Sequence, residues 1–329
     1  MEWKDRKVLV TGAAGFIGSH LVEELSCLGA DVTAFIRYNS RGDTGLLNFL
    51  PKDLLSHVKI IRGDLKDPDA VLKAAKDQEV IFHLAALIGI PYSYVHPLDY
   101  VQTNVVGTTH LLNACLAENI DKIIVTSTSE VYGTAKYVPI DEEHPLQGQS
   151  PYSASKIAAD QIALSYYRSF GMPVTILRPF NTYGPRQSTR AVIPTIISQA
   201  LKKGKVQLGS LTPTRDLTYV SDTVNGFIKI AEAPSTSGEV INIGASKTVS
   251  IGALARLIFD LLEVKIDITE GAERIRPEKS EVGCLMANNE KAKKLMGWSP
   301  EVSLSEGLRR TIQWIKSRLS IYNIDEYHV

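Results

Sequence analysis

The chain has 329 residues, of which 36 are lysine or arginine and 36 are aspartate or glutamate, so its formal net charge is zero. A balanced surface gives no general attraction to nucleic acid or to an anionic membrane, so any anionic ligand must be bound by a local site. The first residues are charged, and no stretch has the length and apolarity of a membrane span, so a cytoplasmic protein is expected.

Strands and helices alternate through the first half of the chain. β-Branched runs predict strands at residues 7–11, 32–37, 58–61, 80–84 and 122–127. Apolar residues at helical spacing predict helices at residues 16–28, 100–117 and 152–170. This alternation indicates an α/β fold with a doubly wound, Rossmann-type parallel sheet.

The pattern changes after about Pro179 to loops rich in proline, glycine, threonine and arginine, interrupted by shorter helices. We therefore expect two domains. Residues 1–180 would form the dinucleotide-binding domain, with returning segments near residues 215–245. Residues 181–329 would mainly form a smaller, mixed C-terminal domain that binds the substrate.

A glycine-rich turn joins the first predicted strand to the first predicted helix. Its glycines would let backbone N–H groups approach a pyrophosphate, and the helix N-terminus favours negative charge. An ordinary tight connection is the alternative, but the position after the first strand of an α/β alternation favours a cofactor. The spacing, GxxGxxG, resembles that of short-chain dehydrogenases. The expected contacts here are Gly12, Gly15, Phe16, Ile17 and Gly18.

The second predicted strand ends without the acidic residue that usually holds the ribose hydroxyls of NAD. Arg37, Asn39, Ser40 and Arg41 follow instead. Two arginines with polar residues between them favour the 2′-phosphate of NADP, with NAD as the alternative. A solvated basic loop would show the same pattern.

Two further strand ends are expected to contact the cofactor. Asp64 and Leu65 follow the third predicted strand, where the short-chain dehydrogenase resemblance implies an adenine contact. Leu84, Ala85 and Ala86 follow the fourth strand, where small residues would let the backbone lie against the cofactor.

Tyr152 and Lys156 begin the predicted helix at 152–170, and their spacing of four places them on one face. The lysine and the positive ring of the cofactor would lower the pKa of the phenol, so Tyr152 would act as a base toward a sugar hydroxyl. A second element, residues 127–133 with the sequence STSEVYG, ends the fifth strand, where open α/β sheets bind ligands. Together with the glycine turn, these elements predict an active site.

From about residue 7 to residue 315 the chain resembles extended short-chain dehydrogenases of the nucleotide-sugar epimerase and dehydratase family. The resemblance implies that Thr128 hydrogen-bonds the sugar 4-hydroxyl and that Tyr152 removes its proton. It also implies that Lys156 holds Tyr152 and the nicotinamide ribose, and that Asn104 supports this network. A dinucleotide sensor without chemistry is the non-enzyme alternative, against which the retained Tyr152 and Lys156 argue.

In such enzymes, the residue at the position of Glu130 would decide which reaction follows oxidation at C4. After oxidation at C4, a carboxylate here can remove the C5 proton while the 6-hydroxyl leaves, and the hydride then returns to C6. Family 4-epimerases commonly lack this carboxylate, so a 4,6-dehydratase is expected. Many hexose 4,6-dehydratases have aspartate where this chain has Ser129, and a serine hydroxyl is too weak an acid to protonate the leaving hydroxyl.

Two competing reactions stay open beside 4-epimerisation. The string TSEVYG also occurs in UDP-glucuronate decarboxylases, and Arg186 would serve as the cation near the C6 carboxylate of such a substrate. Return of the hydride to C4 instead of C6 would release a 5,6-alkene, and Ser129 in place of aspartate keeps that variant in view.

The resemblance also assigns contacts to the nucleotide sugar. Asn181 would meet the diphosphate, Val192 and Ile193 would lie against the nucleobase, and Arg215 and Arg276 would bind phosphate oxygens in paired fashion. A surface salt bridge is the alternative role of each arginine. The full set of expected substrate contacts is Asn181, Arg190, Val192, Ile193, Gln207, Leu208, Arg215 and Arg276.

Within the family, the chain most resembles bacterial N-acetylhexosamine-nucleotide 4,6-dehydratases that begin pathways to sialic-acid-like nonulosonic acids. UDP-N-acetylglucosamine is therefore the expected substrate. An apolar loop at residues 87–93 would cover the sugar and accept an acetamido methyl, or would pack the domain junction. The segments that carry this resemblance are 127–135, 150–157, 180–195 and 215–227.

The predicted helices at 100–117 and 152–170 have more apolar surface than one sheet face usually buries, and the family often pairs them. A homodimer is therefore expected. No cluster of histidine, cysteine and carboxylate has metal-ligand spacing, so no metal is expected. The three cysteines form no framework, which is typical of a reducing compartment.

Overall fold

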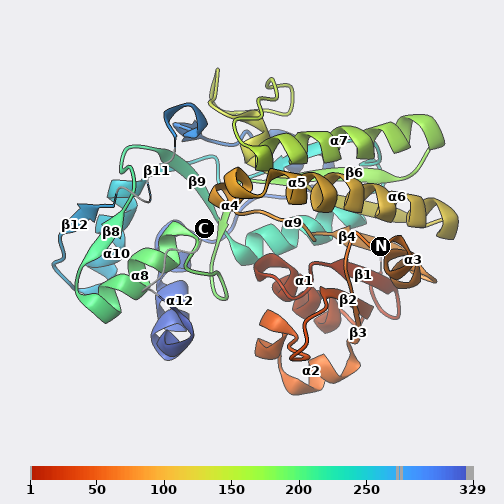
Figure 1. The fold of residues 1–329 in the computed structure, drawn as a ribbon, viewed down its shortest axis with the longest axis horizontal. Coiled ribbons are helices and arrows are strands. Elements are labelled where there is room, and N and C mark those ends of the chain that lie inside the picture. The colour runs from red at the N-terminus through yellow and green to blue at the C-terminus, as the bar shows by residue number, and fades with distance from the viewer. Residues whose placement is uncertain (1, 272–273, 275–276, 324–329) are drawn as a thin grey trace.

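The computed structural model describes residues 2–271, 274 and 277–323. Within these residues, seven parallel strands form the larger sheet, in the order β10-β6-β5-β4-β1-β2-β3. The order reverses between β1 and β4, the switch point of a doubly wound sheet, so the predicted fold is confirmed (Figure 1). The strands are β1 (Lys7–Thr11), β2 (Asp31–Arg37), β3 (Lys59–Gly63), β4 (Val80–His83), β5 (Lys122–Thr126), β6 (Val174–Pro179) and β10 (Val240–Ile243).

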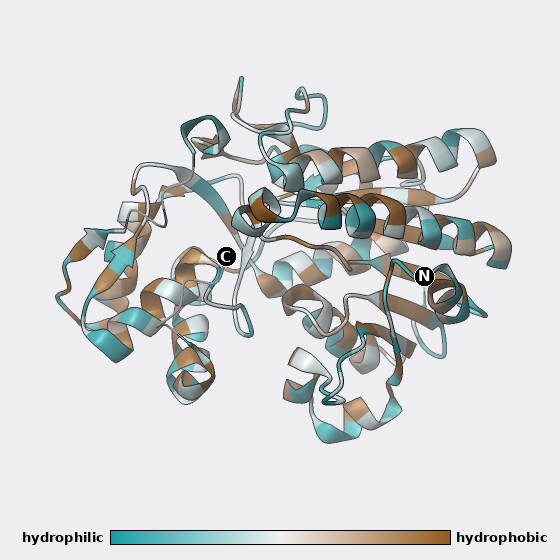
Figure 2. Ribbon diagram, in the orientation of Figure 1, coloured by the Kyte–Doolittle hydropathy of each residue, from teal (hydrophilic) through white to brown (hydrophobic). Residues whose placement is uncertain are grey.

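Helices cover both faces of this sheet, and each face has its own core (Figure 1). Val8 and Val10 of β1 pack beneath α1 and α9, while Leu9 between them packs beneath α6 and α7, as strand alternation requires. Figure 2 shows β1 and β4 mainly in hydrophobic colours. The helices are α1 (Phe16–Cys27) and α9 (Val220–Glu232) on one face, and α3 (Pro68–Ala75), α6 (Gly107–Glu118) and α7 (Pro151–Phe170) on the other.

The second half of the chain builds a smaller body beside the sheet, seen on the left of Figure 1. Its core joins the one beneath α1 and α9 into a single buried cluster. The chain returns from this body to the larger sheet, because α9 packs on the sheet and β10 forms its edge. Its helices and strands are α8 (Val192–Lys203), α10 (Ile251–Leu262), α11 (Glu290–Met296), α12 (Leu304–Ser317), β7 (Asn181–Tyr183), β8 (Val206–Leu208), β9 (Thr214–Tyr219), β11 (Thr248–Ser250), β12 (Ile268–Glu270) and β13 (Cys284–Leu285).

The prediction of an apolar loop at residues 87–93 is wrong in its second part. The structure forms α4 (Ile90–Val95) there, followed by α5 (Pro97–Tyr100). Pro91 lies in the first turn of α4, where its fixed φ suits the helix and its missing N–H has no partner to lose. The predicted helix at 100–117 continues from α5 as a π-helical segment, η2 (Val101–Val106), and then as α6.

Short elements complete the larger half: α2 (Lys52–His57) and the 3₁₀ turns η1 (Gly45–Phe49) and η3 (Ser129–Tyr132). Of the helices that the structure describes, none is both long and apolar enough to span a membrane.

Candidate active site

A cleft of about 1250 Å³ opens at the carboxyl ends of β1, β4 and β5, between the larger sheet and the smaller body. Ligands bind at such a switch point in open α/β sheets. Most of the predicted site residues line it, namely Gly12, Gly15, Phe16, Ile17, Gly18, Arg37, Asp64, Leu65, Leu84, Ala85, Ala86, Thr128, Ser129, Glu130, Tyr152, Asn181 and Arg190.

The glycine turn brings three backbone segments closer than side chains would allow. Gly12 has φ +69°, and a Cβ there would lie 2.7 Å from the Ala85 backbone nitrogen. A Cβ on Gly18 would lie 2.3 Å from the Gly12 carbonyl oxygen. The helix α1 begins after Gly15 without a side-chain cap, so its first N–H groups face the cleft unshielded. This turn fits the pyrophosphate of a dinucleotide.

At the end of β2, one of the four residues expected around the 2′-position reaches the cleft. Arg37 lines it, with its Nε 3.9 Å from Asp64 Oδ2. Asn39 is instead used within its own loop, where its Oδ1 accepts from the backbone N–H groups of Arg41 and Asp43. Asn39, Ser40 and Arg41 do not line the cleft.

Tyr152 lies in the first turn of α7, and Lys156 follows one turn later. A capping box between Ser150 and Ser153 fixes the start of this helix. Both Tyr152 and Lys156 are buried, at 7% and 4% exposure, and the Thr128 side chain lies near the Tyr152 phenol. Lys156 Nζ donates to the Thr126 carbonyl at 2.6 Å.

The protein's own groups act on the pKa of Tyr152 in both directions. Burial raises it above the ordinary value for a phenol, and the nearby Thr128 side chain only partly opposes the rise. Burial also lowers the pKa of Lys156, while the charge of Asp160 raises it. Because Lys156 donates to a carbonyl rather than to the phenol, the protein's own groups keep Tyr152 protonated.

Glu130 enters the cleft from the turn that follows β5. Thr128 Oγ1 caps this turn by accepting the Glu130 N–H at 3.2 Å. The Glu130 carboxylate is near enough to Tyr152 for its charge to raise the pKa of the phenol. Ser129 is almost fully buried. The turn therefore brings a hydroxyl, a phenol and a carboxylate together at one wall of the cleft.

Asn104 links the segment that follows β4 to helix α7. Its Nδ2 donates to Ser155 Oγ and to the Leu87 carbonyl, both at 2.9 Å, and its Oδ1 accepts the Leu87 N–H at 2.8 Å. It lies in the π-helical segment η2, a distortion that is frequent at functional sites. Its predicted supporting position is thus matched by its contacts.

The smaller body presents polar groups to the cleft. Asn181 Oδ1 and Gln187 Oε1 are buried, neither has a hydrogen-bond partner among the residues that the structure describes, and both residues line the cleft. Buried oxygens of this kind are available to a donor on a ligand. Gln187 was not predicted, because a glutamine in a loop carries no pattern in the sequence.

Other predicted substrate contacts lie elsewhere. Ile193 is in the hydrophobic core and Val192 packs against it, because the apolar face of α8 points inward. Gln207 and Leu208 lie on β8, outside the cleft lining. Arg215 is buried and ion-paired with Glu281 at 3.2 Å. Arg276 lies outside the described residues.

Arg186, the expected cation for a C6 carboxylate, is ion-paired with Glu23 of α1 and is itself buried. Its guanidinium also lies over the Trp314 ring, with Cζ 5.9 Å from the ring centroid. These contacts join the smaller body to α1. Arg186 also lines the cleft, and among the described residues its buried Nε has no hydrogen-bond partner.

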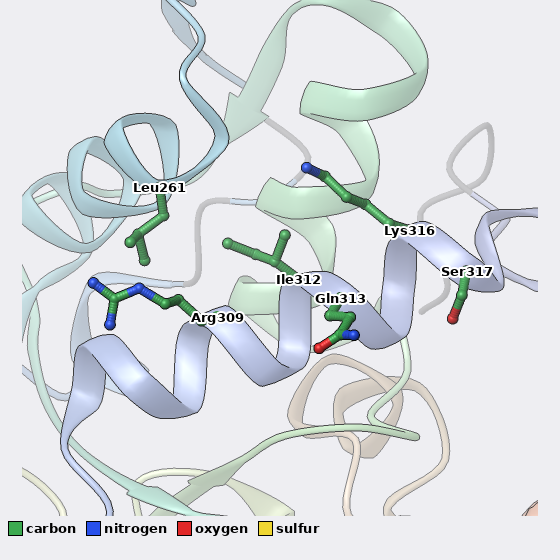
Figure 3. A pocket seen from close by; sticks show the side chains of 6 residues that line it. All are labelled: Leu261, Arg309, Ile312, Gln313, Lys316 and Ser317. Carbon is green, nitrogen blue, oxygen red and sulfur yellow. The ribbon is translucent and has the colours of Figure 1, made fainter.

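A second hollow, of about 570 Å³, lies between α10 and α12 (Figure 3). Arg309, Ile312, Gln313 and Lys316 along α12 line it, with Leu261 of α10 opposite. It shares no residue with the cleft. In the part of the chain that the structure describes, no group of three or more His, Cys, Asp or Glu side chains is placed to hold a metal ion.

Comparisons with known proteins find relatives that match most of this chain. Residues 9–311 match the protein family described as GDP-mannose 4,6-dehydratase. A putative UDP-glucose 4-epimerase of Methanocaldococcus jannaschii is 34% identical, over 94% of this chain and 98% of that protein.

Solved structures share the fold over nearly the whole chain. UDP-N-acetylglucosamine 4-epimerase from Methanobrevibacter ruminantium M1 superposes with a TM-score of 0.87 at 34% identity, covering 96% of this chain and 99% of that one. A dTDP-glucose 4,6-dehydratase from Streptomyces venezuelae with NAD bound also has a TM-score of 0.87, at 28% identity, covering 96% of this chain and 98% of that one.

Proposed function

Because the chain belongs to the NAD-dependent nucleotide-sugar epimerase and dehydratase family of extended short-chain dehydrogenases, we propose that it is a nucleotide-sugar 4,6-dehydratase acting on UDP-N-acetylglucosamine. The observation that carries the choice of reaction is the Glu130 carboxylate, which shares one wall of the cleft with Thr128 and Tyr152. A carboxylate there has a task in a reaction that removes a proton from C5, and none in simple epimerisation at C4.

Each of the three residues has its own task in this reaction. Thr128 holds the sugar 4-hydroxyl. Tyr152, ionised when the positive ring of the bound cofactor lowers the pKa of its phenol, takes the hydroxyl proton while the C4 hydrogen leaves as hydride. Glu130 then takes the C5 proton, which the new C4 carbonyl has made acidic, and gives it to the departing 6-hydroxyl, which leaves as water. Bound NAD or NADP supplies the hydride acceptor and the later hydride donor. Return of the hydride to C6 with a proton added at C5 gives a 4-keto-6-deoxy sugar, and return of the hydride to C4 with the proton of Tyr152 returned to O4 gives a 5,6-alkene.

The apolar and the polar groups of the cleft lining are assigned to the sugar and to the diphosphate. Ile90 and Tyr92 of α4 line it beside Tyr100, whose ring packs edge-on against Tyr152 with centroids 6.2 Å apart. This apolar surface suits the methyl of an acetamido group. Asn181 and Arg190 face the cleft from the smaller body, where they would meet the diphosphate.

Decarboxylation of UDP-glucuronate is the less favoured reaction. It requires a cation for the substrate carboxylate. Arg186 lines the cleft, but its guanidinium is already paired with Glu23. The related epimerases make 4-epimerisation the other reaction against which the proposal must be tested.

The NADP preference expected from the sequence remains a proposal that rests on Arg37, since Asn39 is used within its loop.

A homodimer is likewise proposed, because Leu98, Val101 and Phe170 expose apolar side chains along the helices expected to pair. Light scattering that returns a monomeric mass would contradict the dimer. A cytoplasmic location is proposed because Cys27, Cys115 and Cys284 are free thiols.

The deciding experiment incubates the purified enzyme with UDP-N-acetylglucosamine, first without added cofactor and then with NADP or NAD, before mass spectrometry and NMR of the product. Loss of one water with a new C6 methyl supports the proposal, and an alkene signal at C5–C6 identifies hydride return to C4. Formation of UDP-N-acetylgalactosamine without loss of water, or carbon dioxide release from UDP-glucuronate alone, would overturn it. Tyr152→Phe serves as the control and should form no product.

A further inference from the structure

A buried ion pair lies directly behind the catalytic residues, outside the lining of the cleft. Asp160 of α7 is 0% exposed and Arg178 of β6 is 2% exposed. Asp160 Oδ2 accepts from Arg178 Nε at 3.2 Å and from Nη2 at 3.0 Å, and also from Ser127 Oγ at 2.7 Å. The other carboxylate oxygen is buried and, within the described part of the chain, has no hydrogen-bond partner.

Asp160 continues a series along α7. Tyr152, Lys156 and Asp160 are spaced by four residues and so share one face of the helix. Lys156 donates to the Thr126 carbonyl, Asp160 accepts from the Ser127 hydroxyl, and the Tyr152 phenol lies near the Thr128 side chain. The last residue of β5 and the two residues after it therefore lie against three successive turns of α7.

Arg178 extends this anchor to the turn that carries Glu130. Its Nη1 donates to the Tyr132 hydroxyl at 2.9 Å, and the Tyr132 hydroxyl donates to Asn242 Oδ1 at 2.7 Å. Tyr132 ends the η3 turn, so the same ion pair fixes the turn from below. Thr128 and Glu130 thus have their positions set by groups that no ligand touches.

Burying the charge of Asp160 is unfavourable for folding unless that charge serves a function. Replacing a buried ion pair by apolar residues is often neutral or stabilising, so such a pair is weak evidence for stability alone. The Asp160 carboxylate instead raises the pKa of Lys156 against the effect of burial, and it also raises the pKa of Tyr152. The other charged or titratable groups that face these two are His83 of β4, Tyr100 of α5 and Glu130 of η3.

We propose that Asp160, with Arg178, is a positioning residue for the oxidation at C4, because it holds the end of β5 in register with α7 and supplies the counter-charge to Lys156. This inference rests on the proposed roles of Tyr152 and Lys156. It applies to any family reaction that begins by oxidising C4.

The test compares Asp160→Asn with Ser127→Ala in the holoenzyme, by steady-state kinetics on UDP-N-acetylglucosamine across a pH range. Asp160→Asn removes the charge, whereas Ser127→Ala removes one hydrogen bond to the same carboxylate and leaves the charge. We expect Asp160→Asn to lower kcat about 10- to 100-fold with KM little changed, and to move the pH profile about 0.5 to 1 unit lower. Ser127→Ala should lower kcat less and leave the profile in place, and Asp160→Glu should restore its position.

A second readout needs no substrate. Tyrosinate absorbance of the holoenzyme, taken as the difference from Tyr152→Phe, reports the titration of Tyr152 alone, and Asp160→Asn should move it to lower pH. Inactivity of the wild-type protein on UDP-N-acetylglucosamine would count against the proposed function, while this titration would still decide the role of Asp160.

Two results would overturn the inference. The first is an Asp160→Asn protein that melts at lower temperature but keeps the wild-type pH profile and tyrosinate titration, since a structural role alone predicts this. Where Asp160→Asn fails to fold, the double variant Asp160→Asn with Arg178→Met removes both buried charges and takes its place. A double variant with wild-type kcat, profile and titration is the second overturning result.

Discussion

Substituting Gly12 by alanine tests the cofactor site through one atom. The added Cβ would lie 2.7 Å from the Ala85 nitrogen and 2.9 Å from the Ala85 Cα, both of them backbone atoms that cannot rotate away. The residue would also keep φ +69°, which costs a non-glycine residue about 1 to 2 kcal/mol. Relieving the overlap by shifting the chain adds about 1 to 3 kcal/mol.

The expected loss of stability for Gly12→Ala is therefore about 2 to 5 kcal/mol. For a chain of this length, the average unfolding entropy per residue converts this into a fall of about 3 to 7 °C in Tm. Gly297→Ala is the matched control, because Gly297 has φ +60° but nothing within 4 Å of the added Cβ. It should lose only about 1 to 2 kcal/mol, or about 1.5 to 3 °C.

The assay is thermal unfolding with and without saturating dinucleotide. A ligand at 100 times its Kd stabilises the native state by about 2.7 kcal/mol, which raises Tm. Gly297→Ala should keep this rise, while Gly12→Ala should lose most of it, because the displaced Ala85 backbone lines the cleft beside the glycine turn. A Gly12→Ala protein that melts like Gly297→Ala and keeps the full cofactor-induced rise would refute the reasoning.

Three other side chains give predictions of their own. Glu130→Gln should still reduce its bound cofactor on mixing with the nucleotide sugar but lose water about 100- to 10,000-fold more slowly, and equal loss of both steps in stopped-flow absorbance would contradict its role at C5. Arg37→Ala should weaken NADP about tenfold while leaving the Kd of NAD unchanged, measured by calorimetry, and equal weakening of both would remove Arg37 from 2′-phosphate binding. Burial, with the charge of Arg186, lowers the pKa of His20 to about 4, below its unfolded value of 6.5. The unfolded chain therefore binds one more proton than the folded chain between these two values, and the free energy of unfolding falls as the pH falls from 6.5 towards 4. His20→Gln should therefore lose about 1 to 2 kcal/mol less than the wild type in urea melts between pH 7 and pH 5, and parallel pH curves would contradict this.

The elements that the sequence predicted well are those whose evidence is local. The β1–α1 turn needs only its glycines and the apolar strand before them, and the predicted cleft residues there all line the cleft. The Tyr152 and Lys156 pair needs only helical spacing. A local signal for α3 was also available and unused, since Asp67 caps that helix and Pro68 begins it.

The contacts that the sequence did not predict depend on residues far apart in the chain. Arg186 and Glu23 are 163 residues apart, and nothing near either residue indicates the pairing. Ile193 shows the opposite problem, because an apolar residue on an amphipathic helix suits either a nucleobase or a core, and only the packing of α8 assigns it to the core. The α4 helix was missed because six residues with a proline give too little periodicity.

This division between local and distant contacts has a chemical consequence. The groups proposed to choose the reaction, Thr128, Glu130 and Tyr152, stand on the end of β5 and the start of α7, where the Asp160 and Arg178 pair leaves them little freedom. The groups proposed to choose the substrate lie on α4 and on the loop that contains Gln187. The conformation of these two segments depends on tertiary contacts. Relatives that share about a third of their residues with this chain are named for UDP-glucose in one case and for UDP-N-acetylglucosamine in another, so overall similarity to any single relative does not choose the substrate. For this chain, the proposed reaction therefore rests on the strand-end carboxylate.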